Sequence, residues 1–163
     1  MSEIIAWFCI NYPNLKKQMQ KCEHGNSDIN PYHVEGDCWS HTMMVCKIAE
    51  LKNYDIRVKI AALLHDIAKP KTRKVNPKNK HVQFFGHEEL SSKMAKDILE
   101  TMAKSKLIEN SDIEYIVKLV RFHGIFYKES MEDIKKKFNK EFFKSLKELH
   151  TCDTLGRFNL EKG

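Results

Sequence analysis

The sequence contains no apolar stretch that approaches the about 20 residues of a membrane-spanning helix. A short apolar run follows Met1, but it has neither a basic leader nor a small-residue cleavage site. The five cysteines are odd in number and scattered, and no two form a C-x-x-C pair. We therefore expect a cytoplasmic protein with reduced thiols and no membrane contact.

Several common catalytic signatures are missing as well. The stretch "HEELS" at 87–91 is not the zinc-protease motif H-E-x-x-H, because Ser91 replaces the second histidine. The chain has no Gly-rich phosphate loop, no dinucleotide-binding fingerprint and no G-x-S-x-G. Any phosphate chemistry must therefore come from other residues.

The composition is that of a globular protein. Hydrophobic residues make up 42% of the 163 residues and charged residues 31%, and we find no repeat, low-complexity segment or long linker. We expect a single domain over 1–163. The net charge of +6 weakly favours anionic partners, such as phosphates or nucleic acid.

The hydrophobic pattern is helical along nearly the whole chain, and no stretch shows sustained strand alternation. We predict an all-α fold, a helical bundle, with loops at 24–36 and 70–85 and a short extended piece at 81–85. The predicted helices cover 2–10, 13–22, 38–51, 56–69, 87–104, 112–123, 131–138 and 140–158.

Residues that typically start or end helices support these boundaries. Asp37 and Asp55 are placed to cap the helices that follow them, and Pro70 is expected to stop the helix before it. "SDIE" at 111–114 reads as a capping box, and Gly124 is expected to cap the C-terminus of the same helix.

His65 and Asp66 end the most apolar helix of the chain, in "AALLHDIAK". A buried, unpaired carboxylate is costly, so Asp66 needs a partner, and a divalent cation is one. The alternative is a salt bridge from Asp66 to Lys69, with His65 hydrogen-bonded in the core. The dipeptide alone leaves both interpretations open.

Four more residues of metal-binding type lie near the ends of predicted helices or interrupt apolar stretches. They are His41, His87, His123 and Asp153. Each histidine by itself is more often structural than a ligand. Together with His65 and Asp66 they provide four histidines and two aspartates, enough for two metals with one bridging aspartate.

The order H…HD…H…H…D resembles that of the HD-domain phosphohydrolases. The similarity covers most of the chain, in "HVEGDCWSHT" (33–42), "LLHDIAKPKTR" (63–73), "FFGHEELSSKMAKDIL" (84–99), "IEYIVKLVRFH" (113–123) and "CDTLGR" (152–157). These stretches are most similar to the HD domain attached to bacterial tRNA nucleotidyltransferases (CCA-adding enzymes) and to some RNA-end-healing polynucleotide kinases.

The resemblance implies a helical, metal-dependent phosphohydrolase with one or two divalent metals (Mn, Ni, Co, Fe or Zn). It assigns His41, His65, Asp66 and Asp153 to one metal. Asp66 would bridge to a second metal, which is held by His87 and His123. The resemblance also implies phosphomonoesters and 2′,3′-cyclic phosphates of nucleotides or RNA ends as substrates.

Other residues are candidates for substrate contacts. Lys69 follows His65 by one turn and is a candidate catalytic group beside Asp66, although a solvated lysine at a helix end is the alternative. Thr72 and Arg73 begin a basic loop, and residues 69–80 include six Lys or Arg and no Asp or Glu. The alternative is that this run of charge is only a solvated loop without a substrate role. Arg157 is suited to grip a phosphate, and His33 to donate to a leaving group or orient a ligand.

Two other functions stay open at this stage. Other HD proteins are similar in acting on nucleotides or dinucleoside polyphosphates, and the ligand set fits both substrate classes. A basic RNA-binding module with a structural metal is the non-enzymatic alternative. We expect no nucleotidyltransferase or kinase domain within these 163 residues, which leaves room for a separate RNA-repair protein as a partner. The oligomeric state and the natural substrate stay undetermined.

Overall fold

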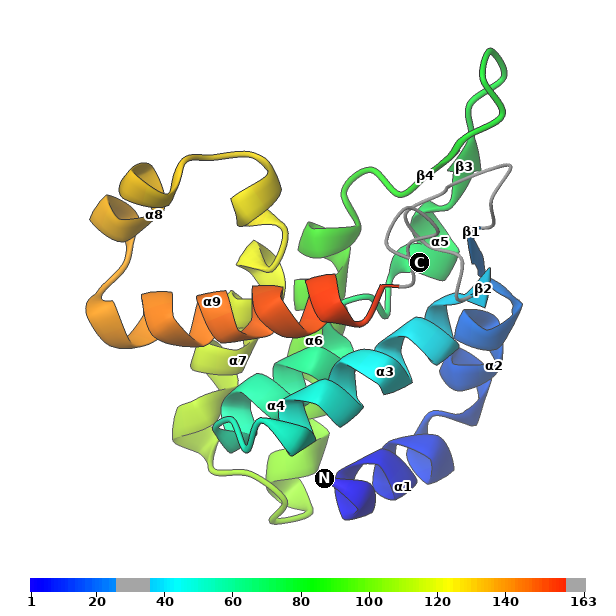
Figure 1. The fold of residues 1–163 in the computed structure, drawn as a ribbon. Helices are drawn as coiled ribbons and strands as arrows, with labels where there is room; N and C mark the ends of the chain where they lie inside the picture. Colours follow the sequence, from blue (N-terminus) through cyan, green and yellow to red (C-terminus); the bar gives the residue numbers. More distant parts are fainter. Residues whose placement is uncertain (26–35, 158–163) are drawn as a thin grey trace.

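The computed structural model describes residues 1–25 and 36–157, and helices make up most of them (Figure 1). The α-helices in these ranges are α1 (Ser2–Asn11), α2 (Pro13–Lys21), α3 (Cys38–Leu51), α4 (Ile56–Leu64), α5 (Lys69–Thr72), α6 (His87–Lys104), α7 (Ile113–Phe122), α8 (Met131–Lys137) and α9 (Lys140–Leu155). Short 3-10 helices, η1 (Asn110–Asp112) and η2 (Ile125–Tyr127), precede and follow α7. The predicted all-α helical bundle is confirmed.

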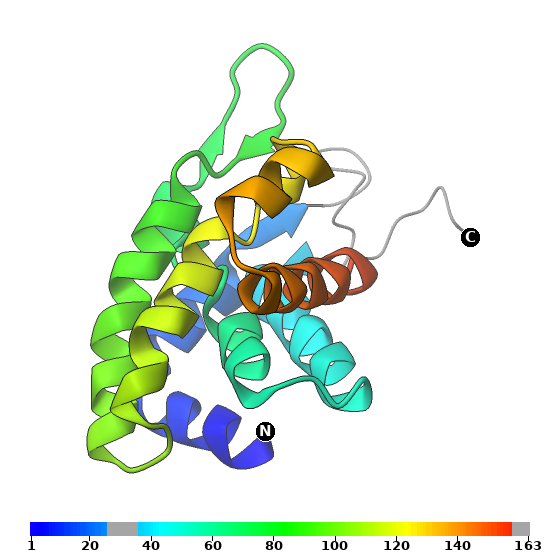
Figure 2. The ribbon, with the colours of Figure 1, turned by 90° about the vertical axis from the view of Figure 1, so that its left-hand side faces the viewer.

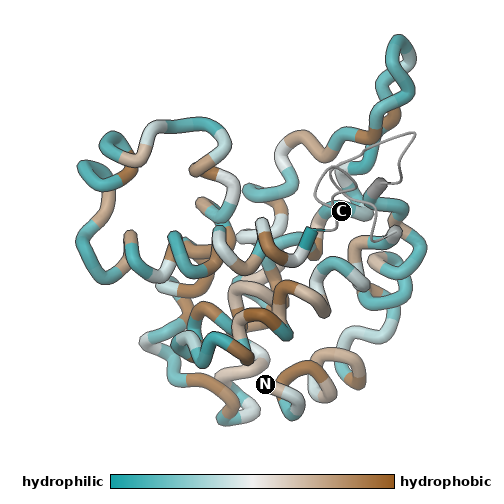
Figure 3. The backbone as a smooth tube through the Cα atoms, in the orientation of Figure 1, coloured by the Kyte–Doolittle hydropathy of each residue, from teal (hydrophilic) through white to brown (hydrophobic). Residues whose placement is uncertain are grey.

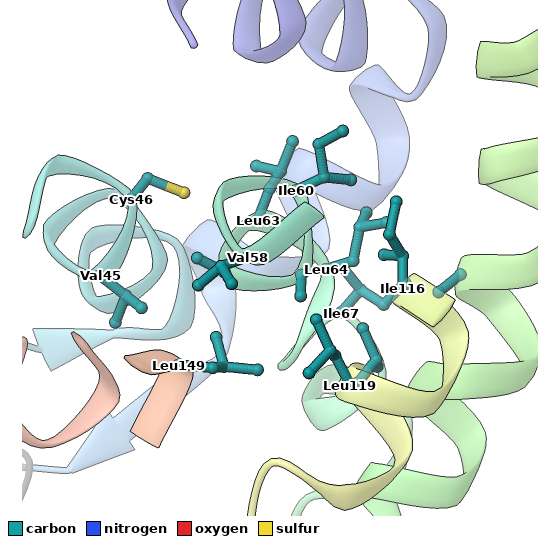
Figure 4. Close-up of a cluster of buried hydrophobic side chains, with 14 of the residues drawn as sticks. Val45, Cys46, Val58, Ile60, Leu63, Leu64, Ile67, Ile116, Leu119 and Leu149 are labelled. Carbon is teal, nitrogen blue, oxygen red and sulfur yellow. The ribbon is translucent and has the colours of Figure 1, made fainter. Parts of the chain in front are cut away.

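Helix α4 lies at the centre of the bundle and contacts α3, α7 and α9. Apart from Arg57 and Lys59 near its start it is apolar, and residues 60–64 are all buried, which is typical of a helix end enclosed by the core. Figure 4 shows side chains of α4, such as Val58 and Leu64, between Val45 of α3, Ile116 of α7 and Leu149 of α9. This packing fixes the end of α4, where His65 and Asp66 follow.

Helices α6 and α7 lie side by side along one flank, while α1 and α2 cover another part of the bundle (Figure 2). Short strands form antiparallel pairs in the described ranges, β1 (Glu23–Gly25) with β2 (Gly36–Asp37) and β3 (Lys74–Val75) with β4 (Val82–Gln83). The β3–β4 hairpin projects from the helical body (Figures 1 and 2). No helix in the described part of the chain combines the length and the apolar character that crossing a membrane requires.

Several predicted boundaries are confirmed. The Asp37 carboxylate accepts hydrogen bonds from the backbone N–H groups of Trp39 and Ser40, each at 2.9 Å. Asp55 accepts one from Arg57 N at 2.9 Å. Helix α6 has the predicted bounds, 87–104.

The predicted helix over 56–69 is wrong at its end. Helix α4 stops at Leu64, and a turn over 65–68 leads into α5. Pro70 does not terminate a helix; it lies in the first turn of α5, where its missing N–H is tolerated. Because Pro70 cannot donate to the carbonyl of Asp66, the N–H of Lys69 does so instead, at 3.0 Å.

Two predicted caps and two predicted loops also need correction. The 111–114 capping box does not form, because η1 comes first and α7 begins without a side-chain cap at Asp112. Gly124 is not a left-handed cap, since its φ is −86°. The segment expected as loop at 24–36 includes strand residues at both ends, and the chain at 74–83 pairs as a hairpin.

Candidate metal centre

The structure brings the six predicted metal ligands together from separate elements of the fold. Their positions are the start of α3 (His41), the turn after α4 (His65 and Asp66), the first residue of α6 (His87), the end of α7 (His123) and the C-terminal part of α9 (Asp153). All are buried except His87, which is half-buried. Their binding of a metal stays a prediction.

Asp66 occupies the middle of this cluster. Its Oδ2 lies 3.2 Å from Nε2 of His65 and 3.8 Å from Nε2 of His41. Its Oδ1 lies 3.3 Å from Nε2 of His87 and 3.7 Å from Nε2 of His123. Two groups with metal-ligand spacing therefore share this one carboxylate.

Asp153 adds a second carboxylate to the group around His41. Its Oδ1 lies 3.0 Å from Nε2 of His41 and 3.8 Å from Nε2 of His65. Its other oxygen, Oδ2, accepts hydrogen bonds from Arg157 at 2.7 Å and from the Tyr127 hydroxyl at 3.2 Å. Arg157 and Tyr127 thus hold the carboxylate with Oδ1 toward the histidines.

The backbone orients the four histidine rings. Each Nδ1 faces a carbonyl oxygen: Ala62 for His65 (2.8 Å), Phe84 for His87 (2.8 Å), Val120 for His123 (2.7 Å) and Gly156 for His41 (3.3 Å). The Ala62 and Val120 carbonyls lie in the last turns of α4 and α7, where helices leave carbonyls without partners. A proton on Nδ1 leaves the Nε2 lone pair toward Asp66, as a metal ligand requires.

The residues fit a bound cation. Within the described residues, Nε2 of His65 and Oδ1 of Asp66 are buried without a hydrogen bond, while Oδ2 of Asp66 forms an ion pair with Nζ of Lys69 at 2.7 Å. Buried polar atoms without a partner are costly unless a charge or a ligand satisfies them. A divalent cation between these histidines and this carboxylate would satisfy the two atoms that Lys69 leaves without a partner.

The electrostatics keep these donors in the form that binds metals. Burial alone would raise the pKa of the Asp66 carboxyl, but His65 and then Lys69 outweigh it and hold the pKa well below its ordinary value. Burial, and after it the nearby His65, lowers the pKa of His123 to about 3. A charged carboxylate and a neutral imidazole are the protonation states of metal ligands.

A cavity of about 440 Å³ opens beside the cluster. Asp66, His87, His123 and Asp153 form part of its wall, and three basic side chains face it. These are Lys69, Lys128 and Arg157. Each of them pairs with a carboxylate of the wall: Lys69 with Asp66, Lys128 with Glu88 and Arg157 with Asp153. These charges balance, and a bound divalent metal would make the cavity attractive to an anionic substrate.

The predicted substrate residues differ in their positions. Lys69 is only 5% exposed, with Nζ 2.7 Å from Oδ2 of Asp66, and Arg157 lines the cavity. Thr72 donates to the carbonyl of Ala68, and Arg73 donates to the carbonyl of Glu23; neither lines the cavity among the described residues. A substrate role for these two stays a prediction. His33 lies outside the described residues.

Sequence reasoning missed His24, which was assigned to a loop. It lies in β1, is fully buried, lines the cavity and contacts Nζ of Lys69. Its ring lies 4.9 Å from that of His41. No local pattern marks His24, because the pairing of β1 with β2 brings it to the site. The cavity also includes Tyr127 and Glu88, which carry no motif of their own.

Comparisons with known proteins identify a family model and a group of relatives. A family model described as "HD domain" matches residues 38–153. The "Multifunctional CCA protein" of Dechloromonas aromatica is 28% identical over 142 residues, which cover 80% of this chain and 32% of that protein. Its namesake from Cupriavidus pinatubonensis is 33% identical over 101 residues, 62% of this chain and 22% of that protein.

The namesake from Nitrosospira multiformis is 30% identical over 93 residues, 57% of this chain and 21% of that protein. The chain thus spans between about a fifth and a third of the length of these curated relatives. No solved structure gives a significant match.

Proposed function

This chain belongs to the HD-domain family, and from that premise we propose that it is a metal-dependent phosphohydrolase. The proposed substrates are 2′-phosphates or 2′,3′-cyclic phosphates of RNA ends or nucleotides. One observation carries the proposal: the Asp66 carboxylate is shared by two histidine groups at the wall of a cavity with basic side chains.

In the proposed site, His41, His65, Asp66 and Asp153 would hold one metal. Asp66, His87 and His123 would hold a second. When bound, such metals supply Lewis-acid stabilisation of phosphoryl charge and lower the pKa of water. The structure leaves the kind of metal open, because imidazole and carboxylate suit several.

The basic side chains have separate roles in this proposal. Lys69 is buried beside Asp66 and would neutralise phosphoryl charge where water is largely excluded, so that its effect is strong. Arg157 keeps one buried guanidinium nitrogen, Nε, without a hydrogen bond among the described residues, although another nitrogen binds Asp153. Arg157 lines the cavity and would add its positive charge beside a bound phosphate. Lys128 is more exposed and would meet the substrate at the cavity edge.

The finer substrate assignment is supported by the resemblance to the HD domain of CCA-adding enzymes and by the curated relatives, which are called Multifunctional CCA proteins. The cavity volume of about 440 Å³ lies within the range of small-ligand sites. A terminal nucleotide fits such a volume, whereas a folded RNA does not enter it.

The experiment compares wild-type protein with Asp66→Ala, and uses Asp97→Ala, an exposed aspartate on α6, as the matched control. Each is supplied in turn with Mn, Ni, Co or Zn. Products from 2′-AMP, 2′,3′-cyclic AMP and a dinucleoside polyphosphate are separated by chromatography, and circular dichroism verifies the fold.

We expect metal-dependent cleavage of the 2′-phosphate or the cyclic phosphate by wild type and Asp97→Ala, and at least about 100-fold less by Asp66→Ala. Cleavage of the polyphosphate alone would replace the proposed substrates with the nucleotide class. Tight metal binding without cleavage of any ester would contradict the phosphohydrolase and favour a basic RNA-binding module.

A further inference from the structure

The hairpin of residues 74–83, here called the basic hairpin, extends from the bundle next to the cavity (Figures 1 and 2). Its turn is held by its own hydrogen bonds. Asn76 N donates to His81 O at 2.9 Å and Lys80 N donates to Asn76 O at 2.8 Å. The Asn76 and Asn79 side chains accept from Lys78 N and His81 N. The turn of the hairpin therefore has a defined shape that its own hydrogen bonds maintain.

The charge of the basic hairpin has one sign. Lys74, Lys78 and Lys80 are exposed, and none forms an ion pair within the described residues. No acidic residue occurs between Asp66 and Glu88. The tip is uniformly hydrophilic (Figure 3). Neighbouring like charges repel, so this arrangement gains nothing for the stability of the fold and is typical of an anion-binding surface.

The basic hairpin leads directly into the cavity. Residues 82–86 continue from β4 as part of the cavity wall, and His87 follows them. In the sequence, Phe85 lies between Lys80 and His87; it lines the cavity and is 76% exposed. An exposed aromatic ring next to a basic strip provides a stacking surface for an unpaired base.

The distance along the chain from the hairpin tip to Phe85 is also longer than a single nucleotide. Four residues lie between Lys80 and Phe85, so these two positions can be at most about 16 Å apart along the chain. Stacked nucleotides rise about 3.4 Å each, so up to about five of them cover this length. The hairpin lysines lie outside the cavity wall, so an RNA longer than one nucleotide can contact them while its end lies in the cavity.

We propose that the basic hairpin and Phe85 form a binding surface for single-stranded RNA whose terminal phosphate lies in the cavity. The proposal rests on the proposed function, because that function places the reacting phosphate beside Asp66. The lysines bind successive phosphates of the backbone, and Phe85 stacks on a base close to the end. A duplex lacks the unpaired base that Phe85 needs.

The experiment uses a ten-nucleotide RNA that ends in a 2′,3′-cyclic phosphate and, beside it, 2′,3′-cyclic AMP. The test variant combines Lys74→Gln, Lys78→Gln and Lys80→Gln. A control variant changes three exposed lysines outside the cavity wall by the same charge: Lys47→Gln, Lys52→Gln and Lys104→Gln. Phe85→Ala is a second, independent test. Binding of the labelled RNA is measured by fluorescence anisotropy over a range of salt concentrations.

We expect the ratio of kcat/KM for the ten-nucleotide RNA to kcat/KM for cyclic AMP to fall about tenfold or more in the hairpin variant and to stay at the wild-type value in the control. The slope of log K against log salt should decrease by about 2, since three phosphate contacts are lost at about 0.7 each. Phe85→Ala should weaken RNA binding by about 5- to 100-fold.

An unchanged ratio, or an equal loss of RNA binding in the hairpin and control variants, would overturn the proposal. Cleavage of cyclic AMP by wild type tests the proposed function separately. If wild type cleaves cyclic AMP and the kcat/KM ratio does not change in the hairpin variant, the proposed function is supported and the RNA surface is refuted. If RNA binding depends on the hairpin while no ester is cleaved, the surface stands and the proposed function is refuted.

Discussion

Nζ of Lys69 lies 2.7 Å from Oδ2 of Asp66, on the carboxylate that two groups of histidines share. The lysine is 5% exposed and the aspartate 1%. Lys69 therefore provides a positive charge where a metal would also bring one. It stabilises the buried carboxylate in the metal-free protein, and it competes electrostatically with a cation.

We expect Lys69→Met to have three effects. The metal-free protein should lose about 3 kcal/mol of unfolding free energy, because a buried ion pair is broken. The dissociation constant for a divalent metal should decrease, since a like charge is removed. Turnover should fall about 100-fold, because a group that stabilises phosphoryl charge is lost. Chemical unfolding, metal titration and steady-state kinetics measure these quantities.

Lys71→Met is the matched control, because Lys71 is exposed and lies two residues away. It should change none of the three quantities by a large amount. Weaker metal binding in Lys69→Met would mean that the lysine assembles the site rather than competing with the metal.

The two histidine groups should bind metals separately. His41→Ala and His123→Ala each remove one ligand from a different group, so each should lose about one equivalent of metal. Asp66→Ala should lose both, and with them the thermal stabilisation that metal gives. Saturation at about 100 times the dissociation constant corresponds to about 2.7 kcal/mol. Metal analysis after gel filtration gives the stoichiometry.

His81→Ala, which alters an exposed histidine of the hairpin, should keep the wild-type metal content. If wild-type protein binds only one equivalent and His123→Ala retains it, the group of Asp66, His87 and His123 is not a metal site.

Two glycines allow close approaches that position the site. A Cβ on Gly156 would lie 2.7 Å from Cγ2 of Val45 and 3.3 Å from its backbone N, and the Gly156 carbonyl faces His41. A Cβ on Gly124 would lie 2.8 Å from Oε1 of Glu88, at the end of a flexible side chain.

We therefore expect Gly156→Ala to destabilise the protein more than Gly124→Ala, by about 2–3 kcal/mol against about 1 kcal/mol. Gly156→Ala should also weaken metal binding, because His41 loses its orientation. Thermal unfolding with and without metal tests the order. The reverse order would show that Glu88 cannot move aside.

The stability of the protein should depend on His150 at mildly acidic pH. Its ring packs 4.8 Å from Phe126 and 4.9 Å from Tyr127, and burial lowers the pKa of His150. The unfolded chain then binds a proton below about pH 6.5 that the folded protein resists. The free energy of unfolding should thus fall as the pH decreases from 7 to 5.

His150→Phe should reduce this decrease, because a phenyl ring fills the same space and does not titrate. Denaturant unfolding at several pH values, with His81→Phe as the exposed control, gives the comparison. Identical pH profiles for His150→Phe and wild type would contradict the expectation. Protonation of the candidate metal ligands affects the unfolding of wild type, His150→Phe and His81→Phe equally, so it does not alter the comparison between them.

The sequence by itself determined the helical fold and singled out the six candidate metal ligands. Apolar periodicity placed α6 at its observed bounds, and Asp37 and Asp55 capped their helices, because these signals are local and involve a few neighbouring residues. These candidate ligands stood out because histidine and aspartate are unusual in an apolar helical context. Their order along the chain then matched a family.

Only the tertiary structure decided how these residues meet. The 3.0 Å approach of His41 to Asp153 depends on the packing of α3 against α9, which lie far apart in the sequence. His24 reaches the cavity through strand pairing, and Arg73 turns from it toward Glu23. The Glu88 side chain approaches the backbone at Gly124 closely, a contact that no local pattern predicts. Contacts between distant segments depend on packing and strand pairing, so the sequence around each residue does not predict them.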